Sequence, residues 1–236
     1  AAGEVIQHAV RAYGLLLAAA GALFAVLGIA LLAALTWVSS RGKFMFMDNV
    51  LTRRALIKQP WNEFATEARS YFWWRIAFGL AAFLALAVPA AGLAAGAIWG
   101  FRGPGIAWTG AMAAGAAGLL FFIALAAVLF TGLLAEDFVL PLMRRHRCRT
   151  LDAWRILLPA VRTRPGPFVL YALIRGVLGF AVGIAVFTAI VLTCCCLAVP
   201  LMIPYIGTVL LLPIPVFFRA LGPFFLRQFG GPLDVA

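Results

Sequence analysis

Few residues in this chain have the types and the spacing that catalysis requires. The two histidines, His8 and His146, fall on opposite sides of a membrane in the topology derived below, so they cannot share one metal ion. The sequence lacks the His-Glu-Xaa-Xaa-His motif of metalloproteases and the glycine-rich loop with a lysine that binds phosphate. No histidine stands within a predicted span, which argues against histidine-ligated haem there. We therefore expect no catalytic residue, no metal and no cofactor.

The cysteines are a weak candidate for chemistry. Cys194, Cys195 and Cys196 stand together near the predicted outer end of the fourth span, and Cys148 is predicted on the other side. Consecutive residues of a helix point about 100° apart, so this run does not have the spacing of a zinc or iron–sulfur site. Disulfides between adjacent cysteines are strained. We interpret the run as small apolar residues, with a disulfide to an external partner or lipid attachment as the alternatives.

Charged residues inside the predicted spans are the other candidates. Glu136 and Asp137 stand at the inner end of the third span, where they could pair with Arg175 or Arg219. These arginines lie deeper than interfacial residues should. Such a charge costs about 2.5–3.5 kcal/mol on insertion scales and usually faces protein or a water-filled cavity. The default interpretation is a structural ion pair, and the alternative is a site for a substrate or a lipid phosphate.

The arginines near the inner ends of the spans also suit anionic lipid, because a guanidinium group can bind phosphate through two hydrogen bonds. Arg75 stands close enough to the start of the second span to reach back to the headgroups. The predicted lipid- or anion-binding residues are Arg53, Arg54, Arg75, Arg144, Arg145, Arg175 and Arg219. The predicted interfacial anchors are Trp61, Trp73, Trp74 and Trp154.

Long apolar helices must position these residues. The chain has 236 residues, of which 65% are hydrophobic and 11% charged, whereas soluble proteins are about half apolar and about a quarter charged. Several apolar runs exceed the roughly 18 residues that indicate a membrane-spanning helix. We predict an all-α, polytopic transmembrane helical bundle that forms a single integral membrane domain over residues 1–236. The predicted spans cover about residues 13–38, 71–100, 106–135, 168–199 and 201–225.

Basic residues set the predicted orientation. The net charge is +11, and most of the lysines and arginines lie in two long connections, residues 41–70 and 144–164. The positive-inside rule places both connections and the C-terminus in the cytoplasm of a bacterium and the N-terminus of this chain outside its inner membrane. The chain begins at Ala1 without an initiator methionine, and a removed leader or a preceding helix would agree with this orientation. Membrane orientation explains the charge, so we expect no nucleic-acid partner.

The two long connections are too apolar and too periodic to be simple loops. Apolar residues recur at helical spacing over residues 43–51, and Pro60 can begin a second short helix because its missing N–H has no partner there anyway. In the other connection Thr150 is a predicted N-cap, with Asp152 in the first turn. We predict amphipathic helices that lie in the cytoplasmic interface in both connections.

The two connections share an order of landmarks, which indicates an internal repeat. Each has an aspartate, an Arg-Arg pair, a tryptophan and an arginine before the next span. These are Asp48, Arg53, Arg54, Trp61 and Arg69 in the first connection, and Asp137, Arg144, Arg145, Trp154 and Arg162 in the second. We predict two parallel repeats, of about residues 13–100 and 106–199, followed by the fifth span. The alternative is that any two cytoplasmic connections collect arginine and tryptophan.

The composition of the spans predicts how they bend and pack. The fifth span is rich in proline, so its helix should be kinked or broken around residues 213–215. Small residues four apart in the second and third spans permit close approach of two helices. These small residues are Gly92, Gly96, Gly110, Ala114 and Gly118.

Three segments carry a family resemblance: RGKFMFMDNV at residues 41–50, PWNEF at 60–64 and SYFWWR at 70–75. They resemble a family of uncharacterised bacterial polytopic membrane proteins. The remainder matches only in layout, which is loosely similar to the membrane domain that accompanies some glycerophosphodiester phosphodiesterases. Members of the family commonly carry a further hydrophobic segment upstream, so the resemblance implies that this chain lacks its beginning. The resemblance implies no activity and transfers no catalytic residue.

We expect a non-enzymatic integral membrane protein, an accessory or scaffold subunit of a membrane complex. Its basic cytoplasmic face would bind anionic lipid headgroups or an acidic partner, and other membrane subunits are expected partners. The alternative is a transporter or lipid-moving protein that uses the proline-broken fifth span and the intramembrane arginines. A membrane-embedded enzyme is a third possibility that depends only on the phosphodiesterase-domain similarity.

Overall fold

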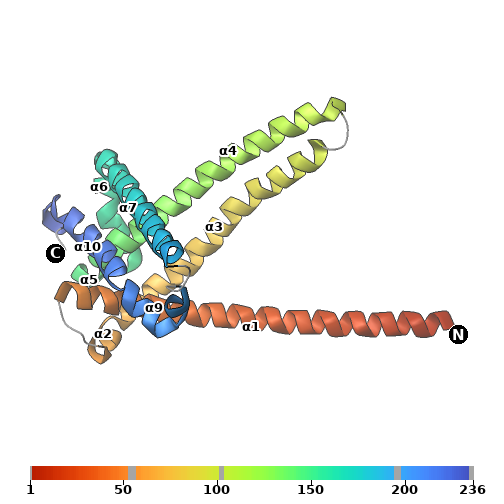
Figure 1. The fold of residues 1–236 in the computed structure, drawn as a ribbon, viewed down its shortest axis with the longest axis horizontal. Coiled ribbons are helices and arrows are strands. Elements are labelled where there is room, and N and C mark those ends of the chain that lie inside the picture. Colours follow the sequence, from red (N-terminus) through yellow and green to blue (C-terminus); the bar gives the residue numbers. More distant parts are fainter. Residues whose placement is uncertain (1, 53–56, 101–103, 194–197, 234–236) are drawn as a thin grey trace.

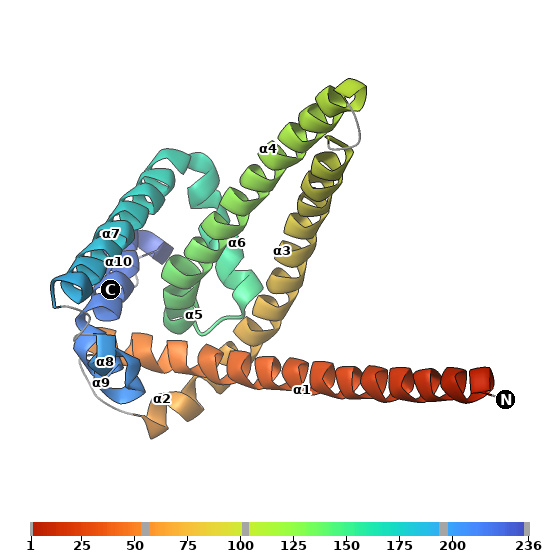
Figure 2. The same cartoon turned by 45° about the vertical axis from the view of Figure 1, so that its right-hand side comes forward.

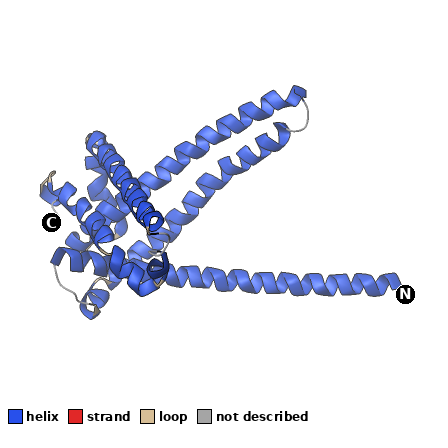
Figure 3. Ribbon diagram, viewed as in Figure 1, coloured by secondary structure: helices blue, strands red, loops and turns tan. Residues whose placement is uncertain are grey.

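The computed structural model describes residues 2–52, 57–100, 104–193 and 198–233, and these residues are helical nearly throughout, without a strand (Figure 3). The all-α prediction is therefore confirmed for the described residues. The elements in chain order are α1 (Ala2–Thr52), α2 (Lys58–Glu63), α3 (Ala65–Gly100), α4 (Pro104–Leu134), the π-helical η1 (Ala135–Val139), α5 (Leu140–His146), α6 (Thr150–Thr163), α7 (Pro165–Leu192), α8 (Ala198–Met202), α9 (Pro204–Leu211), α10 (Pro213–Arg227) and the 3-10 turn η2 (Gly231–Leu233).

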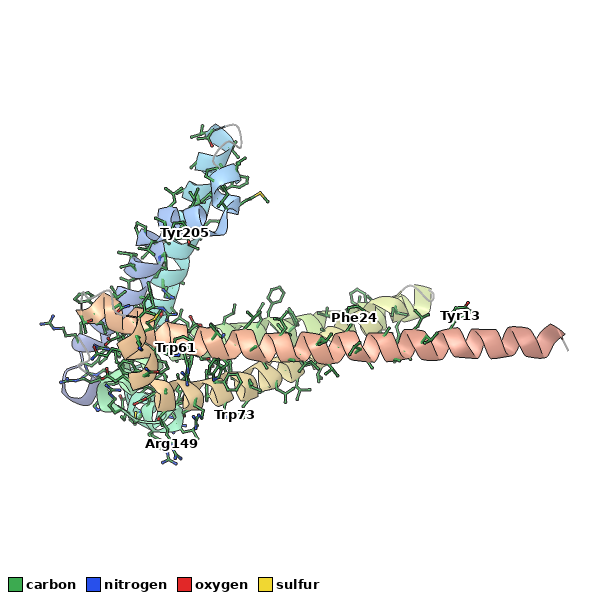
Figure 4. The ribbon with its side chains drawn as sticks, turned by 90° about the horizontal axis from the view of Figure 1, so that it is seen from below. Tyr13, Phe24, Trp61, Trp73, Arg149 and Tyr205 are labelled. Atoms are coloured by element: carbon green, nitrogen blue, oxygen red, sulfur yellow. The ribbon has the colours of Figure 1, made fainter. Side chains whose placement is uncertain are left out.

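The helices meet at one end of the molecule and diverge from it. In Figures 1 and 2, α1 leaves this end as a straight arm toward the N-terminus, and α3 and α4 leave it as a hairpin. Figure 4 shows that α7 and the helices after it leave in a different direction from α1, α3 and α4. We call the meeting point the hub, and we define it by the buried residues Phe44, Phe64, Tyr71, Phe138 and Phe168 together with the side chains that contact them.

Aromatic contacts between helices form the core of the hub. Phe44 of α1 lies edge-on to Tyr71 of α3, with ring centroids 6.0 Å apart. Phe138 of η1 contacts Phe168 and Tyr171 of α7 at centroid distances of 5.5 and 4.8 Å. Aromatic pairs of this kind contribute about 0.5–1.5 kcal/mol beyond the burial of their area. The hydrophobic core therefore joins α1, α3, η1 and α7 at one end.

Outside the hub the long helices expose apolar surface. Among the described residues, four helical stretches are long and apolar enough to cross a membrane, and the number rises to five if the bent pair α9 and α10 counts as one span. Leu17 and Phe24 of α1 are 74% and 75% exposed, which suits lipid rather than water. These long apolar helices indicate a multi-pass membrane protein, as predicted.

Small residues bring α3 and α4 close together, as predicted. A Cβ atom added to Gly96 would lie 2.7 Å from the backbone nitrogen of Ala114, and one added to Gly92 would lie 3.2 Å from the Cβ of Ala117. Only a hydrogen atom fits at Gly96, so the two backbones can approach each other there.

The helix of the first predicted span continues past the predicted end of that span. The structure differs from the expected separate interfacial helix over residues 43–51, because α1 continues unbroken to Thr52. Nothing at the junction interrupts the backbone hydrogen bonds: no proline is present, and the Ser40 hydroxyl donates to the carbonyl of Thr36 at 2.7 Å, within the helix. Phe44 and Met47 consequently enter the hub core from the end of α1.

The start of α6 also differs from the prediction. Arg149, rather than Thr150, is the N-cap residue, and its backbone is extended. The hydroxyl of Ser70 in α3 accepts a hydrogen bond from the backbone N–H of Thr150 at 3.1 Å. Asp152 stands in the first turn of α6, as predicted. The cap therefore comes from another helix and links α3 to α6.

The expected break in the last span is confirmed. The helix pair of residues 205–211 and 213–227 bends by 47°. Pro213 begins α10, where its missing N–H and its ring prevent the helix from continuing straight from α9.

Candidate functional site

The acidic pair of the third span lies on the π-helical segment η1, which connects α4 to α5. A π-turn inserts an extra residue into an α-helix, and such turns occur frequently at functional sites. Asp137 is 2% exposed, whereas Glu136 is only partly buried. The insertion therefore directs two adjacent carboxylates toward the neighbouring helices α1, α7 and α10.

Asp137 binds α7. Its Oδ2 atom lies 2.5 Å from Nε of Arg175 and accepts a hydrogen bond from the Tyr171 hydroxyl at 3.0 Å. On the other side, a Cβ atom added to Gly222 of α10 would lie 2.1 Å from the Asp137 carbonyl oxygen. The predicted ion pair with Arg175 is confirmed, and α10 lies directly against the backbone of η1.

Glu136 binds α1 and α10. Its Oε1 atom accepts a hydrogen bond from the ammonium group of Lys43, and its Oε2 atom lies 3.7 Å from Nη2 of Arg219. Arg219 Nη1 also donates to the Glu136 carbonyl at 3.1 Å. The prediction that Arg219 pairs with this acidic segment is confirmed. The two carboxylates together connect η1 to three other helices.

A cavity of about 530 Å³ lies beside this cluster, between η1, α7 and α10. Glu136, Arg175 and Arg219 form its charged side. Ile214, Pro215 and Phe218 form part of its apolar side, and the guanidinium of Arg175 lies 5.1 Å from the ring centroid of Phe218. The cavity is therefore amphipathic, but its two arginines already have carboxylate partners.

Other arginines from the predicted lipid-binding set also contact protein. Arg144 lies 2.8 Å from Oδ1 of Asp48. Arg75 donates hydrogen bonds to the hydroxyls of Ser39 and Ser40 of α1, at 3.2 and 3.4 Å. Arg145 is exposed, without an ion pair among the described residues. Arg53 and Arg54 lie outside the described residues.

The predicted tryptophan anchors form two contacts between helices. Trp61 of α2 lies edge-on to Trp37 of α1, with the Arg41 guanidinium 4.6 Å from the Trp37 centroid and 5.3 Å from the Trp61 centroid. Trp74 and Trp154 have centroids 5.8 Å apart and join α3 to α6. Trp73, by contrast, points outward and is 64% exposed.

Sequence reasoning missed a second basic cavity of about 660 Å³ between the starts of α3 and α6. Arg69, Arg149 and Arg155 line it together with Trp73. The arginines were visible in the two basic connections. Their convergence depends on the packing of α3 against α6, for which the sequence carries no local signal.

The acidic residues of the hub are all committed to ion pairs. Arg147 pairs with Glu63 and also lies 3.7 Å from Glu67, and Arg155 lies 3.6 Å from Asp152. Each described acidic side chain has such a partner. The full set is Asp48, Glu63, Glu67, Glu136, Asp137 and Asp152.

The described residues offer little for redox or metal chemistry. Among them, no group of three or more His, Cys, Asp and Glu side chains could hold a metal ion. Partial burial raises the pKa of the Cys148 thiol, and the nearby carboxylates of Asp152 and Glu67 raise it further, so the thiol is protonated and less reactive at neutral pH. The cysteines at 194–196 and the side chain of His8 lie outside the described part.

The family of unknown function DUF7544 matches residues 2–228 of the chain. Comparisons with curated proteins and with solved structures gave no match.

Proposed function

The chain belongs to the DUF7544 family, and we propose that it is a non-enzymatic integral membrane protein whose hub binds anionic lipid headgroups at the cytoplasmic face of a bacterial inner membrane. In this role it serves as an accessory or scaffold subunit of a membrane complex. One observation about the charges of the hub supports the proposal. The described acidic side chains form ion pairs within the protein, while a surplus of basic side chains is exposed.

The surplus forms what we call the basic face. Its residues are exposed and have no ion pair among the described residues. They are Lys58, Arg69, Arg145, Arg149, Arg162, Arg164 and Arg227. A lysine or arginine near an anionic leaflet contributes about 1 kcal/mol to membrane attraction. Because no described carboxylate forms an ion pair with these residues, the phosphates of anionic lipids are their expected partners.

The arrangement of the hub supports the proposed orientation. The Trp61 and Trp154 segments both belong to the hub, through contacts with α1 and α3 respectively. The end of α10, with Arg227, lies there as well (Figure 1). One end of the molecule thus carries both basic connections and the C-terminal arginine, which is the charge asymmetry expected of a cytoplasmic face.

The proposal includes the internal repeat, and matched contacts support it. Tyr71 and Arg75 stand four residues apart near the start of α3, and Tyr171 and Arg175 have the same spacing near the start of α7. Each tyrosine ring contacts a phenylalanine from an earlier element: Tyr71 contacts Phe44 of α1, and Tyr171 contacts Phe138 of η1.

Native mass spectrometry of the protein purified in mild detergent tests the lipid-binding role. We expect wild-type protein to retain phosphatidylglycerol in preference to phosphatidylcholine. The variant Arg145→Gln/Arg162→Gln/Arg164→Gln/Arg227→Gln should retain less phosphatidylglycerol, and the matched Arg→Lys variant should retain it, because it keeps the charges. A wild-type protein free of lipid, or equal retention by the glutamine variant, contradicts the proposal.

A transporter or lipid-moving protein is the second candidate, and the cavity beside η1 favours it. That cavity brings Arg175 and Arg219 together with residues 214 and 215 at the break of the last span. Broken helices line substrate sites in many transporters. In reconstituted vesicles this function predicts flux of an anion or lipid that Arg175→Ala abolishes while the protein still assembles. Wild-type vesicles that move nothing across a broad lipid and anion panel would remove its support.

A further inference from the structure

We propose that the cavity between α3 and α6 binds the phosphate of an anionic phospholipid headgroup. This inference rests on the proposed function and assigns one defined site within it. The cavity measures about 660 Å³, and none of its lining residues belongs to the predicted lipid-binding arginines. A headgroup phosphate and free phosphate present the same oxygen atoms, so the test below separates these two sources.

The cavity carries an excess of positive charge without fixed partners. Arg69 and Arg149 are exposed and have no acidic partner among the described residues. Arg155 is 82% exposed and lies 3.6 Å from Asp152, the one acidic residue that lines this cavity. An exposed ion pair of this kind is weak, so the guanidinium can exchange this carboxylate for a phosphate. Three guanidinium groups thus border one cavity that contains one carboxylate.

Neutral hydroxyl groups line the cavity together with the arginines. Thr66, Ser70 and Thr150 supply these hydroxyls, and the Ser70 and Thr150 oxygens lie 3.2 Å apart. The first turn of α6 also borders the cavity, and the N-terminal end of a helix favours anions. Hydroxyl and guanidinium donors on several sides suit a tetrahedral oxyanion better than a planar carboxylate.

The surroundings of the cavity favour a lipid over a soluble anion. Trp73 lines the cavity and is 64% exposed, as is usual for a tryptophan at the headgroup level. Figure 4 shows Trp73 and Arg149 on the same side of the hub. From this point α3 continues as a candidate span, with Leu80 and Phe83 61% and 67% exposed. A phosphate held by the arginines would therefore have its acyl chains alongside the apolar surface of α3.

The cavity beside η1 is a weaker site for the same headgroup. Its arginines, Arg175 and Arg219, are bound to Asp137 and Glu136 within the hub. A lipid phosphate would have to displace partly or fully buried carboxylates there, whereas the arginines of the α3–α6 cavity are exposed.

The decisive experiment is a titration of the full chain in mild detergent with phosphatidylglycerol, followed by native mass spectrometry. We compare Arg69→Gln/Arg149→Gln with Arg162→Gln/Arg164→Gln, which removes the same charge from the same basic face outside the cavity. The first variant should weaken the tightest phosphatidylglycerol site by about tenfold or more, because it removes charge-assisted hydrogen bonds to the phosphate. The second variant should also weaken it, but by only about threefold or less, because its exposed charges attract the anionic lipid without contacting the phosphate.

Each outcome decides between the two proposals. Equal weakening by both variants overturns the site but leaves lipid binding by the basic face. A wild-type protein that binds no phosphatidylglycerol overturns both. Inorganic phosphate that competes as strongly as the lipid overturns the assignment to a headgroup and points to a soluble anion.

A fluorescence measurement keeps the arginines intact and therefore holds even if the double variant does not fold. Phosphatidylglycerol brominated on its acyl chains should quench the fluorescence of the wild-type protein, and Trp73→Phe should remove a large part of this quenching. The matched control is Trp108→Phe at the distant start of α4, which should leave unchanged the quenching that arises from tryptophans in the hub. Equal loss in both variants contradicts the site.

Discussion

Asp137 is the charged residue most deeply committed to the hub. Its carboxylate is nearly inaccessible to solvent, and its partners Arg175 and Tyr171 both come from α7. The attraction within a buried ion pair is largely offset by the cost of removing both charges from water. The main consequence of the pair is that losing one partner is costly, because the other charge then stays buried alone. We therefore expect the acidic segment η1 to stabilise the packing of the helices, even though it borders a cavity.

We expect Asp137→Ala to lower the free energy of unfolding by about 3–5 kcal/mol, because Arg175 would then be buried without a counter-charge. The double variant Asp137→Leu/Arg175→Met should recover most of this loss, since apolar side chains of similar size can replace a buried pair. Denaturation in mixed detergent micelles measures both. Asp152→Ala, which breaks an exposed pair, is the control and should cost less than about 1 kcal/mol. A double variant no more stable than the single one contradicts this account.

The pairs at Glu136 and Asp137 were predictable in part. Their arginines could be named because charges inside spans must find partners. Lys43 could not be named, because it reaches Glu136 only through the unforeseen extension of α1 into the hub. The π-turn leaves no pattern in the sequence either, since it inserts a single residue between two helices of ordinary composition.

At the scale of the elements, the α3–α4 hairpin contains a close contact between two helices outside the hub. The close approach depends on Gly96, where a side chain would meet the backbone of Ala114. One turn away, Gly92 faces Ala117 at a Cβ separation of 3.2 Å, near the distance of about 3.5–4.5 Å found in disulfides. A cysteine pair can therefore report whether the two helices stay in contact.

With the native cysteines replaced, Gly92→Cys/Ala117→Cys should form a disulfide under mild oxidation. Adding Gly96→Leu should prevent most of the cross-linking, because the larger side chain separates the backbones. Adding Gly115→Leu should not, since nothing lies within 4 Å of a Cβ atom at that position. Gel mobility with and without reductant gives the readout. Cross-linking that persists with Gly96→Leu refutes the close approach.

Periodicity and composition identified most elements, but not their ends or contacts across the hub. The broken last span and the contact between small residues could both be predicted from the sequence, because proline and glycine act through local backbone geometry. The cap of α6 was assigned to the wrong residue because Ser70, its partner, stands 80 positions earlier in the chain. The end of α1 was predicted wrongly because the apolar segment and the amphipathic segment after it have the same helical period. This period is the same whether the two segments form one continuous helix or two separate helices.

At the scale of the whole molecule, both basic connections belong to one end. We expect cysteines introduced at Lys58 and Arg162, in a background without native cysteines, to be protected from a membrane-impermeant maleimide in intact cells. Both should react after the membrane is opened. A cysteine at Trp108, an exposed residue near the start of α4, should react in intact cells. Lys58 and Arg162 reacting from opposite sides would exclude the shared face and the lipid site together.

Because α1 is one unbroken helix, its length indicates how deep its residues would lie in a membrane. Residues 16–38 carry no charge and, at about 1.5 Å per residue, extend about 35 Å, slightly more than the hydrocarbon thickness of about 30 Å. Lys43 then stands about 7 Å beyond the end of that stretch. We therefore expect the carboxylates near Lys43 to lie at the level of the headgroups and water rather than among the acyl chains, where a buried charge is far more costly. On this expectation the ion pairs of the hub lie at the membrane boundary, and the apolar helices alone cross the hydrocarbon region.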